Sequence, residues 1–259
     1  MRAEARIVAE ADGRGGTRLA VLRGEAPLLP RRTGPRDDGE VTVHLVGGAA
    51  GPLRGDDLRL DVEVGPGARL ELRSVAAQLA LPGRPGAPPS RLEIRASVAA
   101  GAALRWLPEP LIAATGCHHL AVTLVEVEAG GSLLWRDDLV CGRHDEPSGD
   151  VRADMTVRYA GSTLYRHELS VGPEAPGWSG AAVLGGGRAV GALILAGPAL
   201  PAPEVLGDAA VLMPLAGPGM FAGAVGADIR EVRAALDPLC VPPSPGRCRA
   251  QAATAIGTP

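Results

Sequence analysis

The chain has 259 residues, of which 46% are hydrophobic and only 2% aromatic, and its formal net charge is −3 at pH 7. That length and that hydrophobic content can bury a large core, which excludes intrinsic disorder, and the core must be built mainly from Leu, Val and Ala. All 26 basic residues are Arg, which excludes chemistry that needs a lysine, such as a Schiff base or the phosphate-binding lysine of a P-loop.

The charge pattern and the cysteines favour a cytoplasmic protein. The arginines are scattered and the net charge is small, which argues against nucleic-acid binding. Residues 1–16 are charged and lack the apolar core of a signal peptide, and no apolar run approaches the length of a membrane span. Four cysteines are too few in a chain of this length for a disulfide framework.

Alternation of apolar and polar residues dominates the sequence and predicts β-strands, each with one buried face and one wet face. In chain order, the predicted strands are 41–45, 58–64, 70–73, 92–98, 104–106, 120–127, 151–159, 163–171, 181–184 and 190–195. Breaks rich in Gly and Pro separate them at 30–39, 82–90, 146–149, 172–177 and 197–203.

One helix is clearly predicted near the C-terminus. Residues 228–236 place Ile229, Val232 and Leu236 on one face, and Asp237-Pro238 predicts the end of the helix. From residue 241 onward the chain is rich in Pro and then in small polar residues. We therefore expect an all-β fold, a β-helix-like stack of strands with a few short helices near the C-terminus, as one domain over 1–240 with a loose tail over 241–259.

Three segments of similar form indicate a repeat. Residues 66–72, 100–106 and 129–135 each contain a Gly-bearing turn followed by a short strand, and the aligned Gly67, Gly101 and Gly130 are 34 and then 29 residues apart. A nearly constant period of strand–turn–strand units predicts stacked hairpins or a β-helix-like solenoid. A plain β-meander that reuses Gly-Ala turns would give the same pattern, so these alternatives stay open.

Two short segments rich in Cys and His are candidates for metal chemistry. Residues 116–119 are Gly-Cys-His-His and residues 141–144 are Cys-Gly-Arg-His, and both lie near the ends of predicted strands. Thiolate and imidazole suit Ni²⁺ or Zn²⁺, but the spacing matches no structural zinc pattern, so a metal here would be held weakly. The simpler interpretation is two buried cysteines with surface histidines. Elsewhere, His44 and His167 fit ordinary surface or hydrogen-bonded positions.

Residues 177–183 superficially resemble the nucleophile loop of trypsin-like serine proteases, with Ser179 as the nucleophile. Against this, Trp178 replaces the acid that organises such sites, His118 lies only about 60 residues before Ser179, and no Asp stands out as a third member. A tight turn explains the segment more simply. The alternative function kept open is a hydrolase that uses Ser179, or a zinc ion held by Cys117, His119 and His144.

Carboxylates form a further candidate group. The pairs Asp56-Asp57 and Asp137-Asp138, together with Glu109 between two prolines, could attract a cation or act in acid–base chemistry. Neighbouring residues on a strand point to opposite faces, so only one member of each pair can line a given cavity. Most such pairs are simply solvated charges on turns and edge strands.

Over about residues 41–171, the order of these segments resembles the UreD (UreH) family of urease accessory proteins. Residues 55–58, Gly-Asp-Asp-Leu, are similar to the family's Gly-Asp-x-Leu. The most specific block is 104–110, Leu-Arg-Trp-Leu-Pro-Glu-Pro, which resembles Leu-x-Trp-Leu-Pro-x-Pro, and 138–143 resembles Asp-x-x-x-Gly-Arg. Residues 74–79 depart from the family pattern, so the chain is identified as a divergent member. The motif residues are Gly55, Trp106, Pro108, Pro110, Gly142 and Arg143, and we expect Arg143 to pair with a carboxylate.

The resemblance implies a non-catalytic β-helical scaffold without a permanently bound cofactor, with no nucleic-acid or membrane partner. It implies binding to apo-urease and to the accessory protein UreF, through which the GTPase UreG is bound, and a passage that takes Ni²⁺ to the urease site. A passage needs ligands that bind an ion and then release it, which favours scattered side chains over a closed site. The candidate ligands are Asp56, Glu109, Cys117, His118, His119, Asp138, Cys141 and His144.

Overall fold

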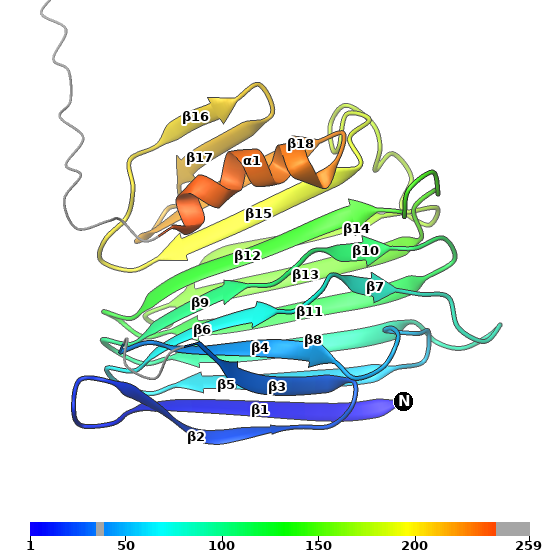
Figure 1. The fold of residues 1–259 in the computed structure, drawn as a ribbon. Helices are drawn as coiled ribbons and strands as arrows, with labels where there is room; N and C mark the ends of the chain where they lie inside the picture. Colours follow the sequence, from blue (N-terminus) through cyan, green and yellow to red (C-terminus); the bar gives the residue numbers. More distant parts are fainter. Residues whose placement is uncertain (35–38, 242–259) are drawn as a thin grey trace, which may run out of the picture.

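The structure, a computed structural model, describes residues 1–34 and 39–241, and most of the regular structure in them is β-strand (Figure 1). The predicted all-β fold is confirmed. Where a few short helices were expected, the described residues contain one, α1 (Ile229–Cys240). Apart from Val241, the predicted tail over 241–259, which contains Cys248, lies outside the described residues.

The strands form two sheets. Sheet A contains, in spatial order, β14 (Ser162–Val171), β13 (Asp150–Tyr159), β11 (His118–Val127), β8 (Ser90–Val98), β5 (Asp57–Val64), β1 (Arg2–Ala11) and β2 (Thr17–Gly24). Sheet B contains β16 (Glu204–Gly207), β17 (Ala210–Pro214), β18 (Gly219–Gly226), β15 (Ala189–Ala196), β12 (Ser132–Cys141), β9 (Ala103–Leu107), β6 (Arg69–Ser74), β4 (Val41–Gly47) and β3 (Leu28–Thr33). Two short strands extend it: β10 (Leu111–Ala113) pairs with β12, and β7 (Gln78–Ala80) pairs with β10.

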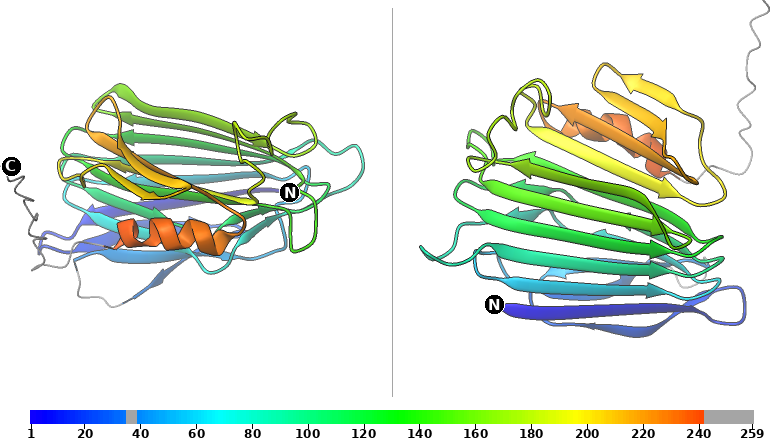
Figure 2. Two further views of the ribbon diagram at one scale, coloured as in Figure 1. Left: turned by 90° about the horizontal axis from the view of Figure 1, so that it is seen from above. Right: turned by 180° about the vertical axis from the view of Figure 1, so that it is seen from behind.

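The repeated segments form the coils of a solenoid, which Figure 2 shows from above and from behind. In each coil a strand of sheet A leads through a turn into a strand of sheet B: β5 into β6, β8 into β9 and β11 into β12. The turn glycines Gly67, Gly101 and Gly130 have φ of 71°, 70° and 83°, a conformation that glycine adopts without strain. Successive coils pair in parallel, for example β5 with β8 and β6 with β9. The solenoid is therefore confirmed, and the hairpin and meander alternatives, which require antiparallel pairing, are wrong.

Three local predictions are wrong. Residues 181–184 are not a strand but part of a glycine-rich loop over 172–187, whose backbone bonds close tight turns, such as Gly185 N to Gly180 O at 2.9 Å. The break predicted over 30–39 does not begin at Pro30, because β3 is an edge strand and can tolerate a residue without an N–H. The helix continues past Pro238 to Cys240, since a proline in the last turn costs only one backbone hydrogen bond there.

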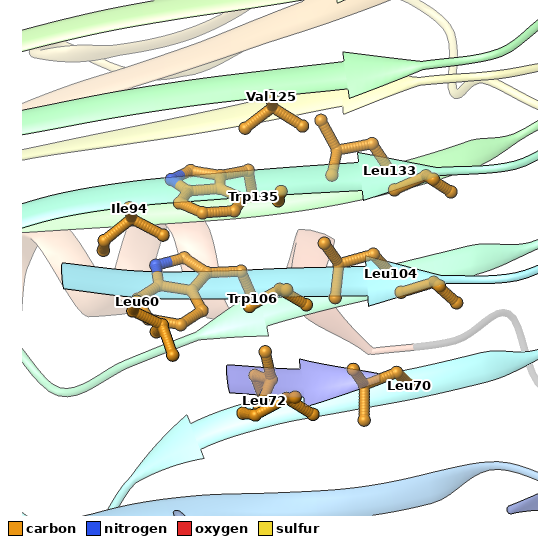
Figure 3. Close-up of a cluster of buried hydrophobic side chains, with 14 of the residues drawn as sticks. Leu60, Leu70, Leu72, Ile94, Leu104, Trp106, Val125, Leu133 and Trp135 are labelled. Carbon is orange, nitrogen blue, oxygen red and sulfur yellow. The ribbon is translucent and has the colours of Figure 1, made fainter. Parts of the chain in front are cut away.

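The centre of the core lies between the sheets and is built around two stacked tryptophans (Figure 3). Trp106 of β9 and Trp135 of β12 are paired in register, with ring centroids 4.8 Å apart and an interplanar angle of 15°. Leu60 and Ile94 come from sheet A on the opposite side. Since aromatic pairs contribute both buried area and stacking energy, this stack concentrates much of the interior packing of an aromatic-poor chain.

Replacing Trp135 with Leu should therefore lower the free energy of unfolding by about 3 kcal/mol, because the stack is lost and a void remains at a fully buried position. Denaturant unfolding followed by circular dichroism measures this loss. Trp178→Leu in the 172–187 loop, where the ring is only half-buried, is the matched control and should cost less than about 1 kcal/mol. Equal losses for the two variants would contradict a core centred on the stack.

Candidate functional site

A cavity of about 900 Å³ lies between the two sheets. It extends along the stack from residues 47–52 to the β16–β17 hairpin, with Ala121 and Ala153 of sheet A among its lining residues. His167 of β14 and Val205 of β16 also line it and are exposed to solvent, so the cavity opens at the C-terminal end of the stack. The fold thus contains a long internal space with an opening.

Asp137 of β12 contributes a carboxylate to this cavity. It lies two residues after Trp135, whose Nε1 donates a hydrogen bond to Asp137 Oδ2 at 3.0 Å. Burial raises the pKa of Asp137 to about 7, and the neighbouring Asp138 carboxylate adds to the rise, whereas the Trp135 hydrogen bond opposes it. Near neutral pH, the Asp137 carboxyl is therefore divided between its protonated and charged forms.

Polar groups on β14 face the same space. Tyr165 and His167 both line the cavity, and their rings stack with centroids 6.0 Å apart. Burial raises the pKa of Tyr165 to about 12, and the negative charge of Asp137 contributes to this rise. Tyr165 thus lies near enough to Asp137 to sense its charge, while His167 lies at the solvent-exposed opening.

Asp137 and His167 are not among the ligands predicted from the sequence. The predicted member of the Asp137-Asp138 pair is Asp138, although Asp137 has the same strand parity as the buried Trp135 and so shares its inward face. That parity was readable from the sequence. His167 fits an ordinary surface position in the sequence, because nothing in one sequence shows that β14 borders an internal cavity.

The predicted ligand Asp138 is engaged elsewhere. Its carboxylate accepts a hydrogen bond from Arg136 Nε at 2.9 Å, and both side chains are buried. Arg136 also pairs with Asp237 of α1, while Arg233 of α1 pairs with Glu109. Asp138 and Glu109 thus belong to ionic contacts that fasten α1 to the outer face of sheet B, although both also border the cavity.

Asp56 binds the start of the chain. Its Oδ1 lies 2.6 Å from the Met1 ammonium group, and its Oδ2 accepts a hydrogen bond from the backbone N–H of Leu53 at 2.9 Å. Since the carboxylate is nearly buried and both of its oxygens have partners, it secures the beginning of β1 against β5.

The two predicted cysteine ligands are buried thiols. Cys117 and Cys141 belong to one small apolar cluster, which also contains Val151, Val171 and Leu184. Burial raises the pKa of Cys117 to about 12 and that of Cys141 to about 11. Because the thiolate is the metal-binding form, both are poor ligands at neutral pH in this conformation.

The three predicted histidine ligands differ in environment. His119 is fully buried, and its Nδ1 lies 2.9 Å from Ser90 Oγ. Burial lowers its pKa to about 4, so it is neutral at pH 7. His118 is partly exposed with Nδ1 3.8 Å from Glu174, and the almost fully exposed His144 lies 3.2 Å from Asp145.

The Gly142-Arg143 motif has a structural role. Arg143 donates a hydrogen bond from Nη2 to Glu146 Oε1 at 2.8 Å, which confirms the expected carboxylate partner. Gly142 has φ of 83°, and a Cβ there would lie 2.2 Å from the Glu146 carbonyl oxygen. This motif therefore shapes the turn after β12.

The solenoid brings most of the predicted ligands to one edge of the stack, where strands of sheet A begin and strands of sheet B end. Those at this edge are Asp56, Cys117, His118, His119, Cys141 and His144. Over residues 1–34 and 39–241, however, no three His, Cys, Asp or Glu side chains form a cluster that could hold a metal ion. The zinc site of the hydrolase alternative is thus not formed in this part of the chain, and Ser179 lies in an exposed turn.

The model of the UreD urease accessory protein family matches residues 1–244. The chain belongs to this family. It is 46% identical over 244 residues to "Urease accessory protein UreD 3" of Streptomyces griseus, covering 92% of this chain and 95% of that protein. It is 44% identical over 262 residues to "Urease accessory protein UreD" of Parafrankia, covering 92% and 88%. The resemblance found in the sequence is confirmed, and UreD family membership supports a role in urease maturation.

The described helix is too short to cross a membrane.

The buried His119 predicts a pH dependence of stability. Its pKa is about 4 in the folded UreD protein, against about 6.5 when unfolded, so the unfolded chain binds the extra proton between these values. This residue's contribution should fall as the pH drops from about 6.5 to about 4, by up to about 3 kcal/mol. The His119→Gln variant can keep a hydrogen bond to Ser90 but has no imidazole to protonate. Its free energy of unfolding, measured beside that of the parent chain at each pH, should not show this loss.

His144→Gln, at an exposed site, is the control and should leave the pH profile unchanged. A His119→Gln profile that runs parallel to the parent profile from pH 4 to 7 would show that His119 is not held neutral.

Proposed function

We propose that this UreD protein is a non-catalytic, cytoplasmic scaffold that passes Ni²⁺ to apo-urease through the cavity between its sheets. The observation that carries the proposal is the cavity itself, which extends along the stack and contains the Asp137 carboxylate. Ion conduction needs sites that bind well enough to admit the ion and weakly enough to release it. A single deep carboxylate meets that requirement better than a closed set of four ligands would.

The environment of Asp137 supplies a release step. With a pKa of about 7, the carboxylate is divided between its charged and neutral forms at neutral pH. The charged form attracts Ni²⁺, and uptake of a proton weakens that attraction, so the ion and the proton compete for the same oxygens. Trp135 Nε1 keeps the carboxylate oriented through its hydrogen bond.

The partners in this proposal are apo-urease, a UreF homologue and, through UreF, the UreG GTPase. The chain has no lysine with which to build a P-loop, which supports assigning GTP hydrolysis to UreG. Nickel is cargo here and not a resident cofactor. The other predicted ligands at the edge of the stack would contact the ion only at entry or exit.

Reconstitution tests the proposal. Purified apo-urease, UreF homologue, UreG homologue, Ni²⁺ and GTP are mixed with and without the full chain, and urease activity and urease-bound nickel are measured. Activity should require the chain, and the chain should co-elute with apo-urease and UreF. Full activation without the chain, or no association with either protein, would overturn the proposal.

Within this assay, Asp137→Asn should slow nickel transfer at least about tenfold, because the path loses its charged oxygen ligand, while association with the partners is unchanged. The parent rate should rise from about pH 6 to about pH 8 as Asp137 loses its proton, and the variant should lack this rise. Asp57→Asn, at a half-exposed residue that pairs with Arg2 on the surface, is the control and should transfer at the parent rate. A variant with the parent rate and pH profile would remove Asp137 from the path.

A further inference from the structure

Sheet B extends beyond sheet A at the C-terminal end of the stack (Figures 1 and 2). β14 is the last strand of sheet A, and it lies opposite β18, because the Tyr165 and Phe221 rings stack with centroids 5.4 Å apart. Sheet B continues past β18 with β17 and β16. In the part of the chain that the structure describes, these two strands have no strand of sheet A opposite them.

The inner face of this overhang is apolar and open to solvent. Pairing in register puts Met213 beside Phe221 and Val205 beside Val211, on the side that lines the cavity. Val205 is 77% exposed and Met213 is 41% exposed. The alternate residue Leu212 is buried on the other face, in the cluster under α1. We name Val205, Val211 and Met213 the shelf.

The strand edge beside the shelf is also unpaired. β14 has ten residues and pairs only with β13, so along its free edge every second residue directs its N–H and C=O away from the sheet. Among residues 1–34 and 39–241, no other segment donates or accepts a backbone hydrogen bond at this edge. The other end of the stack is closed differently, because β2 passes through a short turn directly into β3 of sheet B.

We propose that an extended segment of another protein pairs with the free edge of β14, continues sheet A by one strand and covers the shelf. An unpaired strand edge is a template for such addition, in which backbone hydrogen bonds give affinity and alternate side chains give specificity. The added strand would lie opposite β17, so every second side chain faces the shelf and is apolar.

The charge on the outer face of β14 indicates which polar residue the added segment carries. Arg166 of β14 forms no salt bridge with any described residue, whereas the neighbouring Glu168 pairs with Arg152. An acidic side chain on the outward face of the added strand, beside Arg166, would give Arg166 a cross-strand partner, as Arg152 is for Glu168. The occupant is therefore an extended segment with alternating apolar residues and an acidic residue between them.

A second copy of this chain does not fit the same edge. Two β14 strands paired antiparallel would be related by a twofold axis normal to sheet A, which places both copies of sheet B on the same side. The partner's β14 would then lie under β17, but its own β18 must occupy that layer. The overhang leaves room for a single strand and not for a second two-sheet stack.

A labelled ten-residue peptide with Val at alternate positions and Glu and Thr between them is the probe. The full chain should bind it with a Kd of about 100 μM or tighter by fluorescence anisotropy. Hydrogen exchange with the peptide bound should slow at β14 amides and not at those of β2, the opposite edge strand. A peptide N-methylated at every second amide, on the edge that would pair with β14, should fail to bind.

Met213→Glu should weaken binding at least about tenfold, since a charge replaces an apolar contact on the shelf. Leu22→Glu on β2 is the matched control, because Leu22 is 37% exposed against 41% for Met213, and it should leave the Kd unchanged. Val205→Glu provides a second shelf variant, and all three should unfold near the parent temperature.

Several results would overturn the proposal: no binding up to about 1 mM peptide, protection away from β14, or equal losses for Met213→Glu and Leu22→Glu. A dimer that the peptide dissociates would identify a second copy as the occupant. Severalfold tighter peptide binding after truncation at Val241 would identify the chain's own residues 242–259. Both of these results would also contradict it.

Discussion

The Trp106–Trp135 stack is the contact on which the interior of this solenoid depends, because the two rings hold sheets A and B apart at the centre of the stack. Much of the cavity lining beside the stack consists of aliphatic and small side chains, such as Ala121 and Ala153. Small side chains cannot fill a space whose width is set by tryptophans. The low aromatic content of the chain therefore leaves a cavity between the sheets, and the Asp137 carboxylate lines this cavity.

Strands with strong contrast between Leu or Val and charged residues could be predicted from the sequence, as β5 and β13 show. The first strand, β1, was missed because its inward residues are mostly alanines, Ala3, Ala5 and Ala9, which give weak periodicity. The Gly- and Ala-rich β18 was missed for the same reason. Whether the repeats pair in parallel or antiparallel depends on contacts between distant segments. The sequence therefore suggests a solenoid but does not distinguish it from stacked hairpins or a meander.

The candidate site was predicted less well than the fold. Residue type identified His119 and Cys117 as potential ligands, but burial controls their protonation, and burial is a property of the assembled coils. Cys117 and Cys141 pack in an apolar cluster, whereas His144 lies exposed in the turn after β12, so ligands that the coils bring to one edge still do not converge. Family resemblance supplied the urease context that the residues alone did not.

The overhang of sheet B and the cavity are connected in space, since Val205 belongs to both. A strand added beside β14 would therefore cover the opening near His167 and close the cavity at the C-terminal end of the stack. Partner binding and enclosure of the passage would then be one event. The ion would be sequestered from solvent only while the complex is assembled.

Filling the space between the sheets tests whether Ni²⁺ moves through it. Ala153→Trp places a large ring in the cavity, and Ala20→Trp on the exposed face of β2 is the control. With folding and partner binding verified for both variants, Ala153→Trp should deliver nickel to apo-urease at least about tenfold more slowly than the parent chain. Ala20→Trp should deliver it at the parent rate. Undiminished delivery by a folded Ala153→Trp chain would show that the ion takes another route.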